Sequence, residues 1–364
     1  MEQTSFHRTF SCLQDPRKDR CKKHNLMDII VLSILAVLSG SESYDDIELF
    51  GKENSAFLKQ ILQLNNGIPS HDTINRVFQS IDPRHFEQCF IAWAQGLKED
   101  GVIEGVIAID GKTVRGSKDN FHHRPPFHSI HAWSVEQGLC LGQLECGEKT
   151  NEITAIPQLL DLLDIRGSII TIDAMGTQKN IADKIVESGG DYILAVKANQ
   201  GYLEEEVQTT CKQNRPIFDN TVVEKGHGRI EIRRCEVFER GLIVDFDNRW
   251  KNLTSVIKIT STRELPNKTE TQQRYYISSL KTDRDFNKYI RDHWAVENNL
   301  HWTLDMCFGE DQQRKRANHA AKNFAIVRKI VLNLLKKDNG KGSLRAKRLK
   351  ASWNKDFLMD LIKI

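Results

Sequence analysis

The sequence lacks the features that define several common classes of protein. Its longest apolar run, Ile29 to Leu38, is about half of the ~20 residues that a membrane-spanning helix needs. We therefore expect a core helix there and no membrane role. No start segment resembles a secretory leader, and the eight cysteines never adopt C-x-x-C spacing. We expect reduced thiols in a cytoplasmic protein.

An excess of charge of one sign is also missing, since the formal net charge is only +3. This total neither favours nor excludes a nucleic-acid partner, because it hides local clusters. Two basic clusters stand out, at residues 15–24 and 341–350. Each is compatible with contact to phosphates and with an ordinary solvated surface.

Repeats, low-complexity tracts and a phosphate-binding loop are absent as well. The segment "DGKT", residues 110–113, resembles the end of a G-x-x-x-x-G-K motif. Val106 stands where the first glycine is needed, and Gly105 is one residue off. We therefore set nucleotide hydrolysis aside.

Helical periodicity dominates the chain from Leu26 to Leu97, which predicts an all-helical N-terminal domain over residues 1–100. The segment "IPSHDTINRVF", residues 68–78, fits either half of a helix-turn-helix or a short helix of any bundle.

β-type runs begin near residue 101, and the order up to residue 197 is β-β-β-α-β-α-β. Apolar strands that alternate with helices predict an α/β fold with a mixed sheet and flanking helices. We expect this domain to cover residues 101–337, with a β-rich insertion over about 213–283. A basic C-terminal tail is expected over residues 338–364.

Two aspartates share one context. Asp110 follows "VIAI" and Asp173 follows "IITI", so each ends an apolar strand. Either could cap a helix or serve a turn. If the two strands are neighbours, their carboxylates converge at the edge where functional groups gather in open α/β sheets. Converging carboxylates need a cation, and oxygen ligands suit Mg²⁺ or Mn²⁺.

A third acid is expected from a polar stripe on a later helix, where ionisable residues recur at every fourth position. The stripe is either a solvated face or a face that turns inward and supplies Glu297. A zinc site of the form His-x-x-x-Glu-x-x-x-His is a rival interpretation, which leaves both aspartates unused. The stripe comprises His293, Glu297, His301 and Asp305.

Three acids that hold two divalent ions form a two-metal site of the kind that catalyses phosphoryl transfer. Lys112, Arg115 and Lys197 follow the two acidic strand ends. They could hold flanking phosphates, although basic residues near strand ends are usually ordinary surface residues.

Long stretches of the chain resemble one family. They include "LQDPRKDRCKKHNLMDIIVLSILAVLSG", "GIPSHDTINRVF", "VIAIDGKTVRGS", "SIITIDAMGTQKNIADKIVESGGDYILAVKANQG", "HGRIEIR", "YYISS" and "IRDHWAVENNLHWTLD". They closely resemble the H-repeat-associated insertion-sequence transposases, a branch of the DDE transposases. The resemblance implies an RNase H-like catalytic domain, a helical transposase-associated N-terminal domain, and a β-rich insertion before the last acid.

The resemblance places the family's catalytic, metal-binding acids on Asp110, Asp173 and Glu297. The wider superfamily has a Tyr-x-x-Arg-x-x-x-Glu-x-x-x-x-x-x-Lys signature around the last acid. This chain departs from it, with Ile290, His293 and Leu304 at the other registers.

DNA contacts are implied for Arg229, within "HGRIEIR", and for Arg291 and His293 near the last acid. His293 either replaces the signature's arginine or packs. Trp294 and Trp302 could stack on an unpaired base, but we expect them to pack in the core.

The implied function is a DNA transposase that binds element ends, cleaves a strand with Mg²⁺ or Mn²⁺, and joins the end to target DNA. The partner is double-stranded DNA, a homodimer is expected in the complex, and DNA binding would associate the protein with the nucleoid. Two alternatives are a transposase-derived DNA-binding protein and a metal-dependent nuclease without strand transfer.

Overall fold

A computed structural model describes residues 5–97, 105–147, 151–226, 228–241, 244–245 and 247–363. The boundary predicted between residues 100 and 101 lies outside the described residues, as do His227 and the side chain of Cys21.

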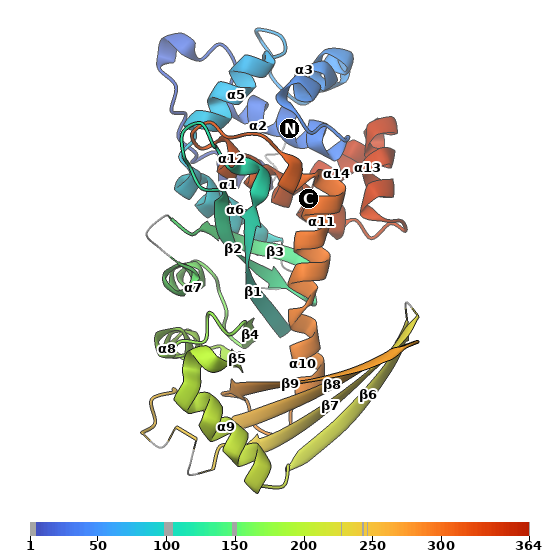
Figure 1. Ribbon diagram of the computed structural model, residues 1–364. Coiled ribbons are helices and arrows are strands. Elements are labelled where there is room, and N and C mark those ends of the chain that lie inside the picture. Colours follow the sequence, from blue (N-terminus) through green and yellow to red (C-terminus); the bar gives the residue numbers. More distant parts are fainter. Residues whose placement is uncertain are drawn as a thin grey trace.

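Helices from both ends of the chain form one end of the molecule (Figure 1). The N-terminal helices are α1 (Ser5–Phe10), α2 (Leu26–Leu38), α3 (Tyr44–Glu53), α4 (Ser55–Leu58), α5 (His71–Ser80) and α6 (Pro83–Gly96). The C-terminal ones are α12 (Ala320–Lys337), α13 (Leu344–Trp353) and α14 (Lys355–Ile362). Helix α12 packs on α2, α5 and α6, so residues far apart in sequence share one core.

Local signals explain where these helices begin. Asn25 caps α2 by accepting a hydrogen bond from the Met27 amide, and Ser43 forms a capping box with Asp46 at α3. Pro83 opens α6, where its missing N–H costs nothing. Helix α2 is apolar on nearly all sides because it is almost completely buried.

A single nine-stranded sheet runs through the rest of the molecule, in the order β3-β2-β1-β4-β5-β9-β8-β7-β6. Strand β1 pairs antiparallel with β2 and parallel with β4, and β4 pairs parallel with β5. The mixed sheet and the predicted β-β-β-α-β-α-β order are confirmed. The strands are β1 (Gly105–Val114), β2 (Phe127–Ser134), β3 (Leu139–Glu145), β4 (Ser168–Ile172), β5 (Asp191–Val196), β6 (Phe218–Gly226), β7 (Arg229–Glu239), β8 (Ser255–Leu265) and β9 (Lys268–Ser278).

The predicted β-rich segment extends this sheet rather than forming a separate one. Strand β9 pairs antiparallel with β5, from Val196–Tyr275 to Ile193–Ser278. Strands β6 to β9 form the long curved part of the sheet in Figure 1. The remaining helices are α7 (Glu152–Asp161), α8 (Lys179–Glu187), α9 (Gly201–Gln213), α10 (Phe286–His293) and α11 (Trp302–Phe308). Short 3₁₀ turns occupy Asp19–Cys21, Arg115–Ser117, Ala198–Gln200 and Glu310–Gln312.

No helix in the described part of the chain is long and apolar enough to cross a bilayer.

Several basic residues of the two clusters form ion pairs or hydrogen bonds within the protein. Arg17 forms an ion pair with Asp15 at 2.7 Å and donates to the His24 carbonyl. In α13, Lys347 donates to the Leu335 carbonyl, and Arg348 donates to the Val37 carbonyl. These cations hold the helices together, so the clusters offer fewer free charges to phosphates than the sequence suggests.

Candidate active site

Asp110 and Asp173 lie side by side at one edge of the β1–β4 pair. The last paired residues of these parallel strands are Ile109 and Ile172, so each aspartate is the next residue of its chain. Contrary to the prediction, Asp110 does not end its strand, because β1 continues to Val114 along β2. It lies where β1 leaves β4, which gives its carboxylate the same position as a strand-end group.

The Asp173 carboxylate is held by a tight turn. Its Oδ1 accepts hydrogen bonds from the amides of Met175 and Gly176, at 3.0 and 3.3 Å. The Asp110 Oδ1 accepts from the Gly111 amide at 2.8 Å. Each aspartate therefore has one oxygen bound to backbone and one left for another partner.

The third acid comes from the helix that connects the curved sheet to the helical end (Figure 1). Between α10 and α11 this helix contains a π-helical turn, Val296–His301, which includes Glu297. The Trp302 amide donates to the Glu297 carbonyl five residues earlier. Such turns are rare in proteins, and those that occur are often found at functional sites.

The π turn explains why a four-residue spacing can face one sheet. In an α-helix with 3.6 residues per turn, every fourth residue advances by about 40° around the axis. A turn with more residues offsets this drift, so the whole stripe turns towards the sheet. His293 contacts Thr171, His301 contacts His131, and Asp305 contacts Lys112.

Asp110, Asp173 and Glu297 line the same pocket, which has a volume of about 710 Å³. Burial raises the pKa of Asp110 to about 7, and the negative charges of Glu297, Asp173 and Glu152 add to the effect. In the described part of the chain, no Lys or Arg forms an ion pair with any of the three pocket acids. The three acids therefore share the pocket without ion-pair partners, although Lys197, Lys212 and Arg274 also line it.

This donor set fits a hard divalent cation such as Mg²⁺ or Mn²⁺, because all three side chains offer carboxylate oxygens. The oxygens of the three acids do not all lie within 4.8 Å of one another. That spacing exceeds one compact three-ligand shell and is compatible with acids shared between two ions. The rival zinc set of His293, Glu297 and His301 is likewise not brought together in the described structure.

A hydrogen-bonded histidine pair lies behind Asp110. The Nδ1 of His301 faces the Asp110 Oδ2 at 3.6 Å, and its Nε2 lies 3.0 Å from the Nδ1 of His131. The Nε2 of His131 is 3.1 Å from the Ser129 hydroxyl. Burial lowers the pKa of His301 to about 3 and that of His131 well below its usual value. Two neutral rings let each contact be a proper donor–acceptor pair, with an N–H directed at Asp110.

Lys112 does not reach the pocket. Only 8% of its side chain is exposed, and its Nζ donates to Asp305 at 2.7 and 2.8 Å, with Asp311 at 3.6 Å. The phosphate contact predicted for Lys112 stays a prediction. The positive charge of Lys112 is neutralised by Asp305 on α11. Arg115 is 85% exposed and lies 3.6 Å from Asp311.

The other predicted DNA-contacting residues lie in or near two adjoining pockets. Lys197 is exposed and lines the acidic pocket. His293 lines the same pocket, and burial lowers its pKa to about 4, so the ring is neutral. Arg229 and Arg291 line the neighbouring pocket.

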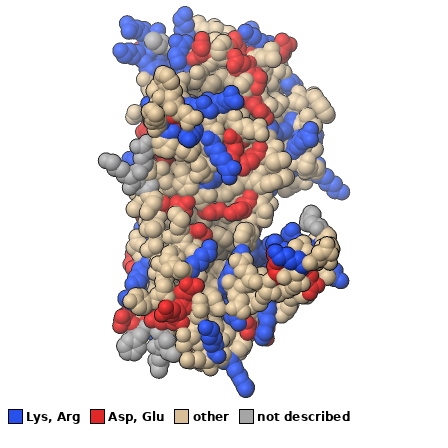
Figure 2. Space-filling view, viewed as in Figure 1, with Lys and Arg blue, Asp and Glu red and all other residues tan. Residues whose placement is uncertain are grey.

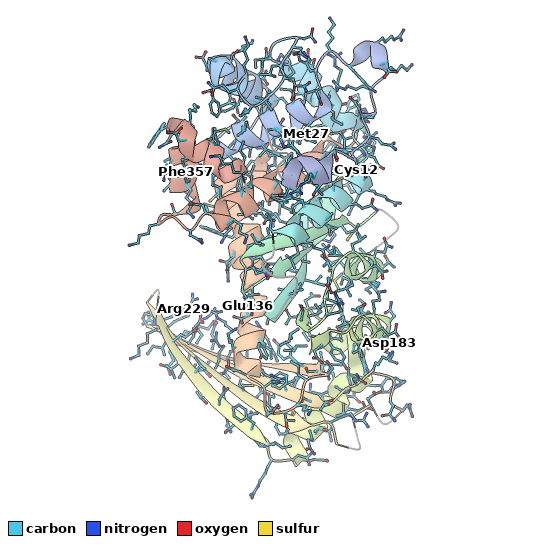
Figure 3. The ribbon with its side chains drawn as sticks, turned by 180° about the vertical axis from the view of Figure 1, so that it is seen from behind. Cys12, Met27, Glu136, Asp183, Arg229 and Phe357 are labelled. Carbon is cyan, nitrogen blue, oxygen red and sulfur yellow. The ribbon has the colours of Figure 1, made fainter. Side chains whose placement is uncertain are left out.

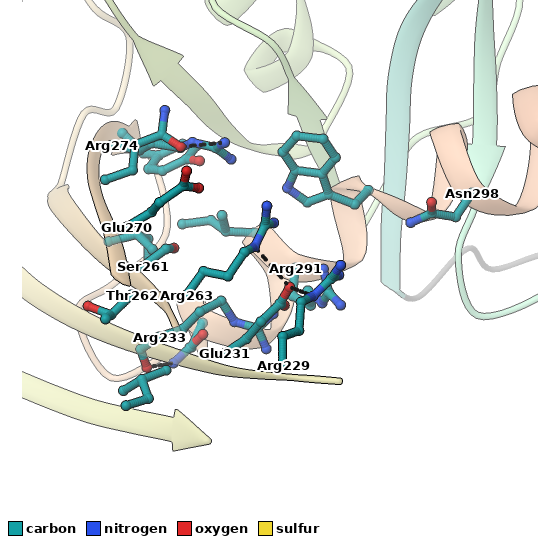
Figure 4. A pocket seen from close by; sticks show the side chains of 17 residues that line it. Arg229, Glu231, Arg233, Ser261, Thr262, Arg263, Glu270, Arg274, Arg291 and Asn298 are labelled. Carbon is teal, nitrogen blue, oxygen red and sulfur yellow. Dashed lines mark hydrogen bonds and ion pairs between the residues drawn. The ribbon is translucent and has the colours of Figure 1, made fainter. Parts of the chain in front are cut away.

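That neighbouring pocket is a basic groove of about 390 Å³ between α10 and strands β7 to β9 (Figure 4). Its arginines are Arg229, Arg233, Arg263, Arg274 and Arg291. Glu231 pairs with Arg229 at 2.7 Å and with Arg263 at 3.5 Å. Arg274 lies over the Trp294 ring at 5.0 Å, and both residues also line the acidic pocket. The groove therefore leads directly to the three acids.

The two tryptophans are not core residues, contrary to the expectation. Trp294 is 36% exposed between the two pockets, and Trp302 is 59% exposed. Trp302 follows the π turn, which directs its side chain to solvent while His301 faces the sheet.

Figure 2 shows acidic side chains in a band across the middle of one face, with Lys and Arg above and below. Fold and site together define an α/β protein with three converging carboxylates in a pocket at the carboxyl edge of its central sheet.

Comparison with known proteins identifies the family. Residues 103–334 match the family model described as "Transposase DDE domain", and residues 7–94 match the model "DDE_Tnp_1-associated". The chain belongs to this DDE transposase family, as the resemblance implied.

Two relatives from Escherichia coli match nearly the whole chain. The H repeat-associated putative transposase YhhI (strain K12) is 43% identical, over 100% of this chain and 98% of the relative. The putative transposase YncI (O157:H7) is 40% identical, over 97% and 93%. A piggyBac transposase synaptic complex with hairpin DNA aligns with 10% identity and a TM-score of 0.43, over 99% of this chain and 78% of the other.

Proposed function

We propose that this protein is an insertion-sequence transposase that binds the ends of its element, cleaves a DNA strand and transfers the freed 3′-hydroxyl to target DNA. One observation carries the proposal. Acids from β1, from the turn after β4 and from the π turn line one pocket, and in the described part of the chain none of them forms an ion pair with a Lys or Arg.

Asp110, Asp173 and Glu297 would hold the divalent cations. When bound, Mg²⁺ or Mn²⁺ would supply positive charge to the attacking and leaving oxygens of an in-line displacement at phosphorus. The neutral N–H of His301 would orient the Asp110 carboxylate, as partners behind metal ligands usually do. Neutral His293, hydrogen-bonded to Thr171 at 3.0 Å, would bring no competing positive charge into the pocket.

The DNA backbone would enter along the basic groove. Arg229, Arg263 and Arg291 lie in the groove, and Arg274 lies at its junction with the acidic pocket. Their guanidinium groups suit phosphate oxygens. Lys197, which lines the acidic pocket, would bind a further phosphate. We propose a homodimer in the DNA complex by analogy with the pairing of two element ends.

The test uses the purified full-length chain, Mg²⁺ or Mn²⁺, and a DNA fragment that carries the inverted repeats flanking the gene. We expect strand cleavage at the repeat and, with a pre-cut end, joining to a second DNA. Cleavage without joining would support a nuclease instead. End binding without either product would support a transposase-derived DNA-binding protein.

A further inference from the structure

Three potential metal ligands meet in the helical end, away from the acidic pocket. The sulfur atoms of Cys12 and Cys89 and a ring nitrogen of His85 all lie within 4.8 Å of one another. In the described part of the chain, no other set of at least three such residues meets this limit. The sequence shows no metal-binding motif here, because Cys12 is more than 70 residues from the other two.

Two helices bring the three side chains together. His85 and Cys89 are four residues apart on α6, so they lie on one face of the helix. Cys12 follows the end of α1, which packs against α6; Figure 3 labels it there. Phe10 meets the ring of Phe86 edge to face at 5.8 Å. The backbone positions of all three ligands are therefore set by apolar packing and need no metal to form.

The distances suit a bound ion better than a covalent bond between the sulfurs. The Cys12 and Cys89 sulfurs are 3.5 Å apart, whereas a disulfide requires about 2.05 Å. Tetrahedral zinc with Zn–S bonds of about 2.3 Å places two sulfurs roughly 3.8 Å apart. The observed pair needs only a small adjustment to reach that spacing.

We propose that Cys12, His85 and Cys89 bind one zinc ion, with the fourth position open to water. Two thiolates and an imidazole are soft and borderline ligands that select zinc over Mg²⁺. Cys12 is exposed, His85 half-buried and Cys89 buried, so the site has an entrance from solvent on the Cys12 side. This proposal is independent of the proposed transposase function.

Binding would replace the proton on each thiol with a bond to zinc, releasing two protons without any change of redox state. The ion would attach the segment after α1 to α6. That segment leads into the basic cluster at residues 15–24, so zinc would fix the start of the cluster on the helical end.

Cobalt titration of the reduced, chelator-treated full-length chain tests the proposal. Thiolate-bound Co²⁺ gives a near-ultraviolet charge-transfer band, whereas Co²⁺ held by carboxylates alone does not. We expect this band to saturate at one equivalent of Co²⁺ and to vanish when Zn²⁺ is added. Cys12→Ser and His85→Gln should each weaken Co²⁺ binding at least about tenfold. Cys211→Ser, a half-buried cysteine on α9, is the matched control and should leave the band unchanged.

Absence of the band in the reduced chain would overturn the proposal, as would a band that survives Cys12→Ser. Mass spectrometry after mild oxidation separates the main alternative. A Cys12–Cys89 disulfide in a chain that never binds Co²⁺ when reduced would identify a redox pair in place of a zinc site. Circular dichroism of each variant checks that the helices are retained.

Discussion

The acids around Asp110 and the buried acid Glu310 differ in their ion-pair partners. Glu310 is completely buried, yet Arg328 and Lys329 lie 3.5 and 3.9 Å from its carboxylate. Asp110 has no ion pair with a Lys or Arg in the described part of the chain; three other acids raise its pKa and a neutral histidine faces it. The first acid is balanced by cations from α12, and the second is left unbalanced.

The comparison separates structural acids from functional ones. A buried carboxylate that pairs with buried cations is part of the packing, because its charge is compensated inside the fold. A cluster of carboxylates without such cations costs stability unless an ion from solution binds. Strongly perturbed acids in a cleft are typical of functional sites. The difference in local charge, more than the presence of acids, marks the pocket around Asp110.

The largest expected effect is on catalysis. Asp110→Asn keeps the shape of the side chain and removes one cation ligand. Because metal sites supply several kcal/mol to the transition state, strand cleavage should fall by more than about a hundredfold. Gel assays with labelled element ends measure this. Asp360→Asn, on the exposed surface of α14, is the control and should retain full activity. Near-normal cleavage by Asp110→Asn would end the proposed function.

A change at Glu310 should instead lower the free energy of unfolding. Glu310→Gln leaves Arg328 and Lys329 buried without their acid, and removing one partner of a buried pair typically costs about 3–5 kcal/mol. Urea unfolding of the metal-free chain measures the loss. Asp110→Asn, measured the same way, should be neutral or stabilising, because it removes an unbalanced charge. Equal losses in both variants would show that the two groups do not differ.

A hard divalent cation such as Mn²⁺ should stabilise the chain through the acids around Asp110. Ligand at 100 times its dissociation constant adds about 2.7 kcal/mol to the folded state. We therefore expect Mn²⁺ to raise the melting temperature of the parent chain and of Asp360→Asn. The shift should disappear in Asp110→Asn. Calorimetry in a chelator-treated buffer provides the measurement, and a shift that persists in Asp110→Asn would point to a different cation site.

Glu87 offers a smaller, pH-dependent case of an acid without a cation. It is 1% exposed, accepts a hydrogen bond from Gln143 at 3.3 Å, and burial raises its pKa to about 7. Because the folded state holds the Glu87 proton more tightly than the unfolded state, the contribution of this group to stability is fully present below pH 4.5. It is lost as the pH rises through about 7. Glu87→Gln should thus stabilise the chain by up to about 3 kcal/mol at pH 8 and by little at pH 4.5. Denaturant unfolding at the two pH values measures the change. An equal effect of Glu87→Gln on the free energy of unfolding at pH 8 and pH 4.5 would contradict this prediction.

The smallest expected effect concerns the basic groove. Arg229→Ala and Arg263→Ala should each weaken DNA binding and reduce the slope of log K against log salt by about 0.9. Arg166→Ala removes an exposed arginine paired with Asp164 outside the groove, and serves as the control. Fluorescence anisotropy over a range of salt concentrations measures the slopes. Identical slopes in all three variants would exclude the groove as the DNA path.

Much of the fold was predictable because the apolar periodicity is strong. Strands β1 to β5 and the helices between them were expected in the correct order. The convergence of Asp110 and Asp173 was expected only if their strands were neighbours, and the pairing of β1 with β4 supplies that condition. The stripe with Glu297 was recognised from spacing alone. The catalytic roles of these acids and the domain boundaries stay predictions.

Other features depend on contacts between distant residues. Nothing in the local sequence distinguishes Lys112, which is buried against Asp305, from Lys197, which is exposed at the pocket. The π turn has no signal of its own, and the core positions expected for the tryptophans were wrong because that turn redirects the helix. The joining of β9 to β5 also follows from edge pairing, which no periodicity encodes.

The sequence by itself determined which segments become helices and strands, since periodicity, caps and turns act over a few residues. Tertiary structure decided which charges meet. It gave Glu310 its cations from α12 and left Asp110 with Asp173 and Glu297, because the packing of distant elements sets the distances on which electrostatic energy depends.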